Sequence, residues 1–244
     1  MVRIMPKTIA IFGAGSGLGA ATARRFGREG YEVALVARRR EPLDELVAQL
    51  GTEGIDAESF TADLSDPSVV PGLLERITTR FDRIDVVEYA PVGSMTEFML
   101  PASRMSAEFL HKHINLLLNT PVELARAVAP QMAERGDGGF LVALGASALD
   151  ASAAPGMSGA PSVAAATRHW VHALNQDLAA TGVYAGLLLV AAVVDGSQGQ
   201  REAEALGIDL TALPTVAPAD LADAHFDLFT KRDRVEQIVP QNAS

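Results

Sequence analysis

Glycine residues gather in one short stretch near the start of the chain, between an apolar run and an amphipathic one. Residues 9–19 read Ile-Ala-Ile-Phe-Gly-Ala-Gly-Ser-Gly-Leu-Gly. Such a turn uses backbone angles that a Cβ forbids, and the N–H groups at the start of the next helix must approach a pyrophosphate closely. An ordinary tight turn is the alternative. The stretch predicts a phosphate-binding turn made of Gly13, Gly15, Ser16, Gly17, Leu18 and Gly19.

The end of the second apolar run, Glu32–Ala37, indicates whether NAD or NADP binds. Sites that select NAD usually carry Asp or Glu there, to accept a hydrogen bond from the ribose 2′-hydroxyl. Here Ala37 ends the run, and Arg38 and Arg39 follow it. Because guanidinium groups pair well with a phosphate, NADP(H) is the predicted cofactor. A solvated basic face at a helix start is the alternative.

Further cofactor contacts are expected after the third and fourth apolar runs. Asp63 and Leu64 follow the third run, where the carboxylate can meet an adenine amino group or instead cap the next helix. Ala90 and Pro91 follow the fourth run and are expected beside the cofactor.

Composition excludes several other kinds of site. The chain has 244 residues, no cysteine and a formal net charge of −10, which excludes thiolate metal sites and disfavours nucleic acid. No long apolar run or secretory signal is visible, so no membrane contact and a cytoplasmic location are expected. His111 and His113 lie on different faces of one helix, so no metal site is predicted and surface positions are expected for both.

Strand-like and helix-like segments alternate along nearly the whole chain. This alternation predicts an α/β fold, a single doubly wound domain over residues 1–244 with right-handed crossovers that place helices on both faces of a parallel sheet. Residues 195–215 are expected to be a substrate lid or a plain surface loop and helix. The expected segments are Thr8–Phe12, Gly17–Gly30, Glu32–Ala37, Pro42–Gly51, Ala57–Thr61, Pro67–Arg80, Asp85–Tyr89, Ser106–Arg135, Gly139–Leu144, Ser162–Thr181, Val183–Val190, Ala217–Arg232 and Val235–Pro240.

Taken together and in order, these motifs resemble the short-chain dehydrogenase/reductase family. The resemblance covers nearly the whole chain and implies one Rossmann-like domain with a seven-stranded parallel sheet, usually dimeric or tetrameric. The residues that carry it are Gly13-x-x-x-Gly17-x-Gly19, Arg38-Arg39, Asp63-Leu64, the helix ending in Pro130-Gln-Met132, the Gly138-Gly139-Phe-Leu-Val strand and the Arg168–Ala180 helix.

The resemblance fails where the family handles protons. Family members that transfer hydride typically use an Asn, a Ser and a Tyr-x-x-x-Lys pair, in which Lys helps the phenol to exchange a proton with the substrate oxygen. No lysine lies four residues after a tyrosine in this chain. The corresponding positions hold Leu117, Ala146, Gly159 and Val163. The departures also include Glu88-Tyr-Ala-Pro91 for Asn-Asn-Ala-Gly, and Val190-Ala191 for Pro-Gly.

Three nearby residues are candidates for replacing that proton relay. The phenol of Tyr89 is a candidate acid, with an aromatic ring packed in the core as the alternative. Ser147 can hydrogen-bond a substrate oxygen or serve as a structural turn hydroxyl. Asn115 can serve if its helix carries an irregular turn, and otherwise lies on the helix surface.

The first functional hypothesis is an NADP(H)-dependent oxidoreductase that acts on a small molecule with a displaced or solvent-supplied proton relay. The alternatives are an inactive NADP(H)-binding or sensing protein and a non-redox enzyme that reuses the pocket. A homodimer or homotetramer through helices 106–135 and 162–181 is also expected, because both carry apolar residues on more than one face.

Overall fold

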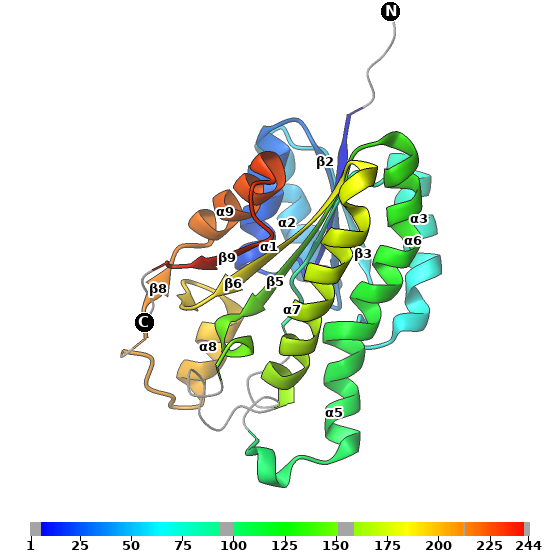
Figure 1. Cartoon of the computed structure of the whole chain (residues 1–244). Helices are drawn as coiled ribbons and strands as arrows, with labels where there is room; N and C mark the ends of the chain where they lie inside the picture. The colour runs from blue at the N-terminus through cyan, green and yellow to red at the C-terminus, as the bar shows by residue number, and fades with distance from the viewer. Residues whose placement is uncertain (1–5, 93–99, 151–158, 212, 242–244) are drawn as a thin grey trace, which may run out of the picture.

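Seven parallel strands form one central sheet in this computed structural model, which describes residues 6–92, 100–150, 159–211 and 213–241. The order is β3-β2-β1-β4-β5-β6-β9, and every neighbouring pair is parallel (Figure 1). Since the order reverses between β1 and β4, a crevice is expected there at the carboxyl ends of the strands. The strands are β1 (Thr8–Phe12), β2 (Glu32–Ala37), β3 (Ala57–Thr61), β4 (Val86–Tyr89), β5 (Gly138–Gly145), β6 (Val183–Val190) and β9 (Glu236–Val239).

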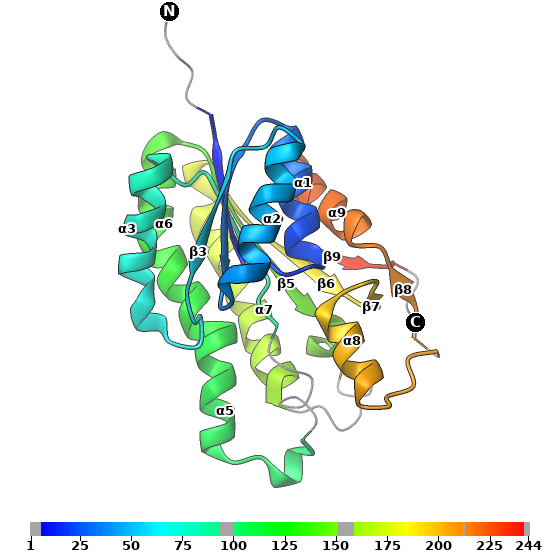
Figure 2. The same cartoon turned by 180° about the vertical axis from the view of Figure 1, so that it is seen from behind.

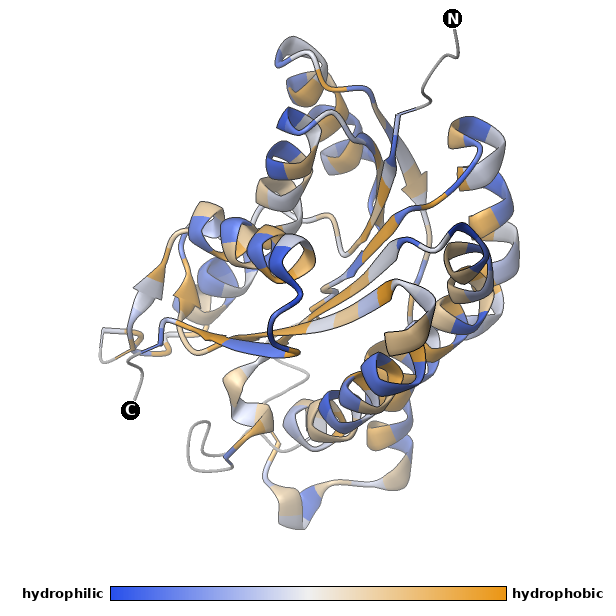
Figure 3. Ribbon diagram, turned by 45° about the horizontal axis from the view of Figure 1, so that its top comes forward, coloured by the Kyte–Doolittle hydropathy of each residue, from blue (hydrophilic) through white to orange (hydrophobic). Residues whose placement is uncertain are grey.

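Helices cover both faces of the sheet, which confirms the predicted Rossmann-like α/β fold (Figures 1 and 2). Along β1, Ile9 and Ile11 join one core cluster while Ala10 and Phe12 join the other, as the alternation of a strand buried on both faces requires. The strands of the central sheet carry much of the orange, hydrophobic colour in Figure 3. The helices on one face are α1 (Leu18–Arg28), α2 (Arg40–Thr52) and α9 (Pro218–Lys231). The helices on the other face are α3 (Val70–Phe81), α6 (Thr120–Arg135) and α7 (Gly159–Leu178). Among the short 3₁₀ turns in the connections are η1 (Pro67–Val69), η2 (Ala102–Arg104) and η6 (Ala179–Thr181).

The long helix predicted over Ser106–Arg135 is interrupted. It consists of α5 (Ala107–Ile114), the π-helical turn η3 (Asn115–Asn119) and α6. A π turn widens the helix and changes its hydrogen-bond pattern. Side chains from neighbouring elements bond to it: the Tyr89 hydroxyl donates to the Leu116 carbonyl, and the Thr167 hydroxyl donates to the Leu117 carbonyl at 2.7 Å.

The segment after β6 folds into a helix between two short strands. β7 (Val193–Val194) pairs in parallel with β8 (Thr215–Val216), and α8 (Gln198–Ala205) lies between them in the chain. The Ser197 hydroxyl accepts a hydrogen bond from the Gln200 N–H at 3.1 Å, while the Gln200 side chain accepts one from the Gly196 N–H at 2.8 Å. This reciprocal capping fixes the start of α8. Residue 212 of the expected lid lies outside the described residues.

None of the helices in the described part of the chain is long and apolar enough to cross a bilayer. The same residues contain no group of three or more His, Cys, Asp or Glu side chains able to hold a metal ion.

A buried acid and a buried histidine face each other between β4 and α9. Glu88 and His225 are both fully inaccessible, and Oε1 lies 3.7 Å from Nδ1, too far for a hydrogen bond. Burial raises the pKa of Glu88 to about 8 and lowers the pKa of His225 to about 4. Both side chains are therefore neutral near pH 6.

This pair gives folding stability a defined pH dependence. The Glu88 contribution is complete below the ordinary pKa of 4.5 and is lost as pH rises through about 8, because the folded state keeps a proton that the unfolded chain releases. The His225 contribution is complete above 6.5 and is lost as pH falls through about 4. The two trends cancel between pH 4.5 and 6.5, so only the Glu88 trend remains above that window.

We expect the free energy of unfolding to fall by about 1 kcal/mol between pH 6.5 and 8. This is less than the roughly 1.4 kcal/mol per pH unit of one full proton, because His225 of the unfolded chain is half-charged at the lower pH and Glu88 of the folded chain is half-ionised at the upper one. The Glu88→Gln variant stays neutral at every pH and should lack this fall in denaturant titrations at the two pH values. Glu58→Gln, at an exposed glutamate on β3, is the control and should keep it. An equal fall in Glu88→Gln and the wild type would refute the neutral state assigned to Glu88.

Candidate functional site

The glycine turn between β1 and α1 is packed closely against the segment that follows β4. Gly13 has a φ of +103°, and a Cβ there would lie 2.6 Å from the Pro91 nitrogen and 2.7 Å from the Ala90 carbonyl carbon. A Cβ on Gly19 would lie 2.8 Å from the Ala14 Cα. Only glycine fits these two positions, and the turn brings Ala90 and Pro91 to the start of α1.

The start of α1 has the features of an anion site. Gly17 is the N-cap residue and no side chain caps the helix. Gly15 and Ser16 are exposed, while Gly17 and Leu18 are half-buried. Because the first N–H groups of a helix have no intrahelical partner and lie at the positive end of its dipole, they suit a phosphate. The six residues predicted for phosphate binding thus lie together at an uncapped helix start.

The two arginines after β2 are exposed. Nη2 of Arg39 donates to Oε1 of Gln198 at 3.0 Å. Within the described residues, neither Arg38 nor Arg39 has a carboxylate within ion-pair distance, whereas Arg40 lies 3.9 Å from Asp44. The cations predicted to select NADP(H) are therefore not neutralised by acids of the described part of the chain.

The residues after β3 are held by local contacts. Asp63 is exposed, and its Oδ1 accepts hydrogen bonds from the Ser65 N–H at 3.0 Å and hydroxyl at 2.8 Å. These bonds form a local turn, whereas the N-cap of the following helix η1 is Asp66, whose side chain accepts a hydrogen bond from the Ser68 N–H. Asp63 therefore does not cap that helix, and its adenine contact stays a prediction. Leu64 is buried, and its carbonyl accepts a hydrogen bond from the Thr120 hydroxyl at 2.8 Å, which ties the end of β3 to α6.

The segment that begins α8 lies against the glycine turn, a contact that sequence reasoning missed. Nη2 of Arg201 donates to the Ser16 hydroxyl at 3.0 Å, and Nη1 donates to the Gly196 carbonyl at 2.6 Å. A Cβ on Gly17 would lie 3.3 Å from the Ser197 Cβ. The Ser197-x-x-Gln pattern is a capping signal that identifies the start of α8, but nothing in the linear order predicts its contact with Ser16.

Tyr89 requires a correction. Its side chain is 1% exposed, its hydroxyl donates to the Leu116 carbonyl, and burial raises its pKa well above the ordinary value. A phenol held in the core in this way does not reach a substrate, so the expected acid role is wrong and the core alternative holds. The reason is strand alternation, which directs Glu88 toward α9 and Tyr89 to the opposite face, under η3.

Asn115 and Ser147 lie in irregular turns. Asn115 begins the π turn, so the irregularity on which its candidate role depends is present; its Oδ1 accepts a hydrogen bond from Nδ2 of Asn119 at 2.8 Å. Ser147 is half-buried in η4 (Ala146–Ala148), directly after β5, and its Oγ lies 3.3 Å from where a Cβ on Gly145 would be. Both remain candidates for orienting a substrate.

The positions that the resemblance assigns to the proton relay are filled by apolar groups. Leu117 and Val163 pack with Ala160 in one small cluster. The Phe109 ring occupies the space that a Cβ on Gly159 would need.

His113 lies beside this apolar cluster. It is buried, which corrects the expected surface position, and its ring centroid lies 4.7 Å from that of Phe109. Its Nδ1 lies 3.0 Å from the Phe109 carbonyl oxygen, one helical turn earlier. His113 and Phe109 therefore add to the packing of α5 against η3 and α7.

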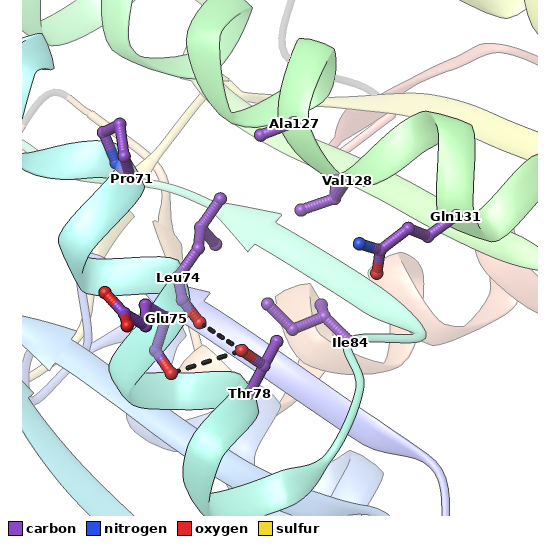
Figure 4. Close-up of a pocket in the computed structure, with 8 residues that line it drawn as sticks. All are labelled: Pro71, Leu74, Glu75, Thr78, Ile84, Ala127, Val128 and Gln131. Carbon is purple, nitrogen blue, oxygen red and sulfur yellow. Dashed lines mark hydrogen bonds between the residues drawn. The ribbon is translucent and has the colours of Figure 1, made fainter.

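A groove of about 270 Å³ between α3 and α6 is not part of this site (Figure 4). It is lined by Leu74, Val128 and Ile84 among others, and Ile84 precedes β4 at the amino end of the sheet. A second hollow of about 430 Å³ between α1 and α9 includes Ser16 and Gly17 and borders the glycine turn from outside.

Solved structures resemble this fold over nearly its whole length. A short-chain dehydrogenase from Sphingobium yanoikuyae in complex with NADPH has a TM-score of 0.81 and 29% identity, covering 97% of this chain and 89% of its own. A metagenomic short-chain oxidoreductase in complex with NADP has a TM-score of 0.76 and 25% identity, covering 96% and 97%.

Sequence relatives agree with the structural ones. Fatty acyl-CoA reductase Rv0547c of Mycobacterium tuberculosis is 34% identical over 137 residues, 56% of this chain and 46% of that protein, so the match spans about half of its length. The 1-deoxy-11-beta-hydroxypentalenate dehydrogenase of Streptomyces exfoliatus is 31% identical over 197 residues, 77% of this chain and 67% of that protein. The family model for short chain dehydrogenase matches residues 7–204. With this match and the fold described above, the chain belongs to the short-chain dehydrogenase family.

Proposed function

We propose that this protein is an NADP(H)-dependent oxidoreductase that acts on a small molecule without the usual Tyr and Lys relay. The observation that carries the proposal is the pair Arg38 and Arg39 at the end of β2, where no acid stands, beside an uncapped glycine turn. The NADPH and NADP named with the two structural relatives support it. A cytoplasmic location belongs to the same proposal.

When bound, the nicotinamide supplies the hydride chemistry, and the protein's part is orientation and exclusion of water. The N–H groups at the start of α1 would hold the pyrophosphate, and Arg38 and Arg39 the 2′-phosphate. Ser147 and Asn115 would hold the substrate oxygen or a water that delivers the proton. General acid help is worth on the order of 10²–10⁴-fold, so acceptors already activated, such as an iminium or a conjugated carbon, suit this site better than simple ketones.

A second candidate is a protein that binds NADP(H) without turning it over. The apolar packing of Leu117 and Val163, and the Phe109 ring against Gly159, favour it, because none of these side chains can transfer a proton. A non-redox enzyme that reuses the pocket is the third possibility. Consumption of cofactor separates the first candidate from the other two.

Arg38→Ala should weaken NADPH binding by about tenfold to a hundredfold and leave NADH binding nearly unchanged, since it removes a charge-assisted contact to the 2′-phosphate. Titration calorimetry with both nucleotides measures this. Arg40→Ala, one residue away and near Asp44, is the matched control and should leave both affinities unchanged. Equal losses for NADPH and NADH in Arg38→Ala would refute the assigned role.

Purified protein should oxidise NADPH slowly with imine or enone acceptors and more slowly still with simple ketones, as followed by nucleotide absorbance. Ser147→Ala should lower kcat at least tenfold without changing the Kd for NADPH, because it removes a donor to the substrate oxygen. Ser68→Ala, at an exposed serine of η1, is the control. Tight NADPH binding with no hydride transfer across the panel would favour the second candidate instead.

A homodimer or homotetramer through helices 106–135 and 162–181 remains part of the proposal. Leu117 and Val163 pack within the subunit, and Trp170 meets Phe140 edge-on with ring centroids 5.9 Å apart. Leu116 and Leu118 of η3 also pack partly against the core, but they stay half-buried and so support contact with a partner. Sedimentation equilibrium should give at least twice the 25.7 kDa of one chain at micromolar concentration. The mass of a single chain under those conditions would contradict this assembly.

A further inference from the structure

Three arginines near the glycine turn have no carboxylate partner in the described part of the chain, although the sequence carries a formal charge of −10. The neighbouring α1 shows the usual arrangement: Arg24 lies 2.6 Å from Glu53, and Arg25 lies 2.7 Å from Asp223. Among the residues that the structure describes, Arg38, Arg39 and Arg201 have no Asp or Glu oxygen within 4.0 Å. In an acidic protein, such a group of unneutralised cations favours an anionic ligand.

One face of α8 brings two of these cations to the same edge of the site. Gln198 and Arg201 are three residues apart and therefore lie on one side of the helix. Gln198 accepts a hydrogen bond from Arg39 at 3.0 Å, and Arg201 donates to Ser16 at 3.0 Å. The hydrogen bonds of this face thus reach both Arg39, after β2, and Ser16 of the glycine turn. The helix α8 itself lies near the carboxyl ends of the strands (Figures 1 and 2).

The partners of Arg201 in this arrangement are neutral. Its guanidinium donates to the Ser16 hydroxyl and to the Gly196 carbonyl, and the side chain is exposed. A guanidinium has five N–H donors and prefers phosphate oxygens, with which it forms shorter and stronger charge-assisted bonds. A phosphate between Ser16 and the end of β2 would therefore gain Arg201 as a ligand in addition to Arg38 and Arg39, which follow β2.

From this geometry we propose that Arg201 is a specificity-determining residue that binds the 2′-phosphate of NADP(H) from α8. The inference rests on the proposed NADP(H) function. It adds a cofactor contact from α8, a helix for which the sequence predicted no cofactor-binding residue. Because Arg201 lies in α8 (Gln198–Ala205), the 2′-phosphate would also hold this helix against the glycine turn. NADPH would then stabilise α8 in this position and NADH would not.

The first test measures affinities. Arg201→Gln should weaken the binding of NADPH and of adenosine 2′,5′-bisphosphate by about tenfold to a hundredfold, and leave NADH and AMP within twofold, as measured by titration calorimetry. Arg201→Lys should recover part of the loss. Arg24→Gln, which removes a paired arginine from α1, is the matched control and should change none of the four affinities.

The second test measures amide hydrogen exchange in residues 198–205. In the wild type, NADPH should slow this exchange more than NADH at equal saturation, and Arg201→Gln should abolish the difference. Equal losses of NADPH and NADH affinity would assign Arg201 to the pyrophosphate and overturn the proposal, as would unchanged affinities.

Binding by the wild type and by Arg38→Ala distinguishes failure of the Arg201 inference from failure of the proposed NADP(H) function. If the wild type prefers NADPH and Arg38→Ala loses that preference while Arg201→Gln does not, the inference on Arg201 fails alone. If the wild type binds neither nucleotide, the proposed function fails as well.

Discussion

The close approach of Gly13 to the segment after β4 is the constraint on which the rest of the site depends. A side chain at Gly13 would meet the backbone of Ala90 and Pro91, so the turn can sit this deeply only because no Cβ is present. The approach holds β1 and β4 at the place where the strand order reverses, and it sets the start of α1 at the mouth of the crevice. An anion site built from backbone N–H groups depends on such placement, because backbone groups cannot adjust as side chains do.

Strand alternation in β4 explains why Tyr89 lies in the core and not at the substrate end of the crevice, where its residue type suggests an acid. Successive side chains of a strand point to opposite faces, so Glu88 enters the core beside His225 while Tyr89 lies beneath the π turn. The Tyr89 hydroxyl then bonds to a carbonyl of the widened helix and supports it. A residue whose type suggests acid catalysis serves here to satisfy a backbone group, which a buried carbonyl requires.

Charge is distributed unevenly around the site. On the outer side of α1, arginines are neutralised by acids of neighbouring elements, and such exposed pairs contribute little to stability. On the side facing α8, guanidinium groups bond instead to neutral oxygens of Ser16, Gly196 and Gln198. Since neutral acceptors hold an arginine less strongly than a phosphate does, these groups remain available to an anionic ligand.

The sequence by itself determined the fold and predicted the cofactor end of the crevice. Those features depend on local patterns: apolar runs for the buried strands, glycines for a turn that excludes Cβ, and arginines at the end of β2. The tertiary structure decided the rest, because it depends on contacts between segments far apart in the chain. The π turn at Asn115, the burial of Tyr89, the Phe109 ring at Gly159 and the contact of Arg201 with Ser16 each need a partner that no local pattern specifies.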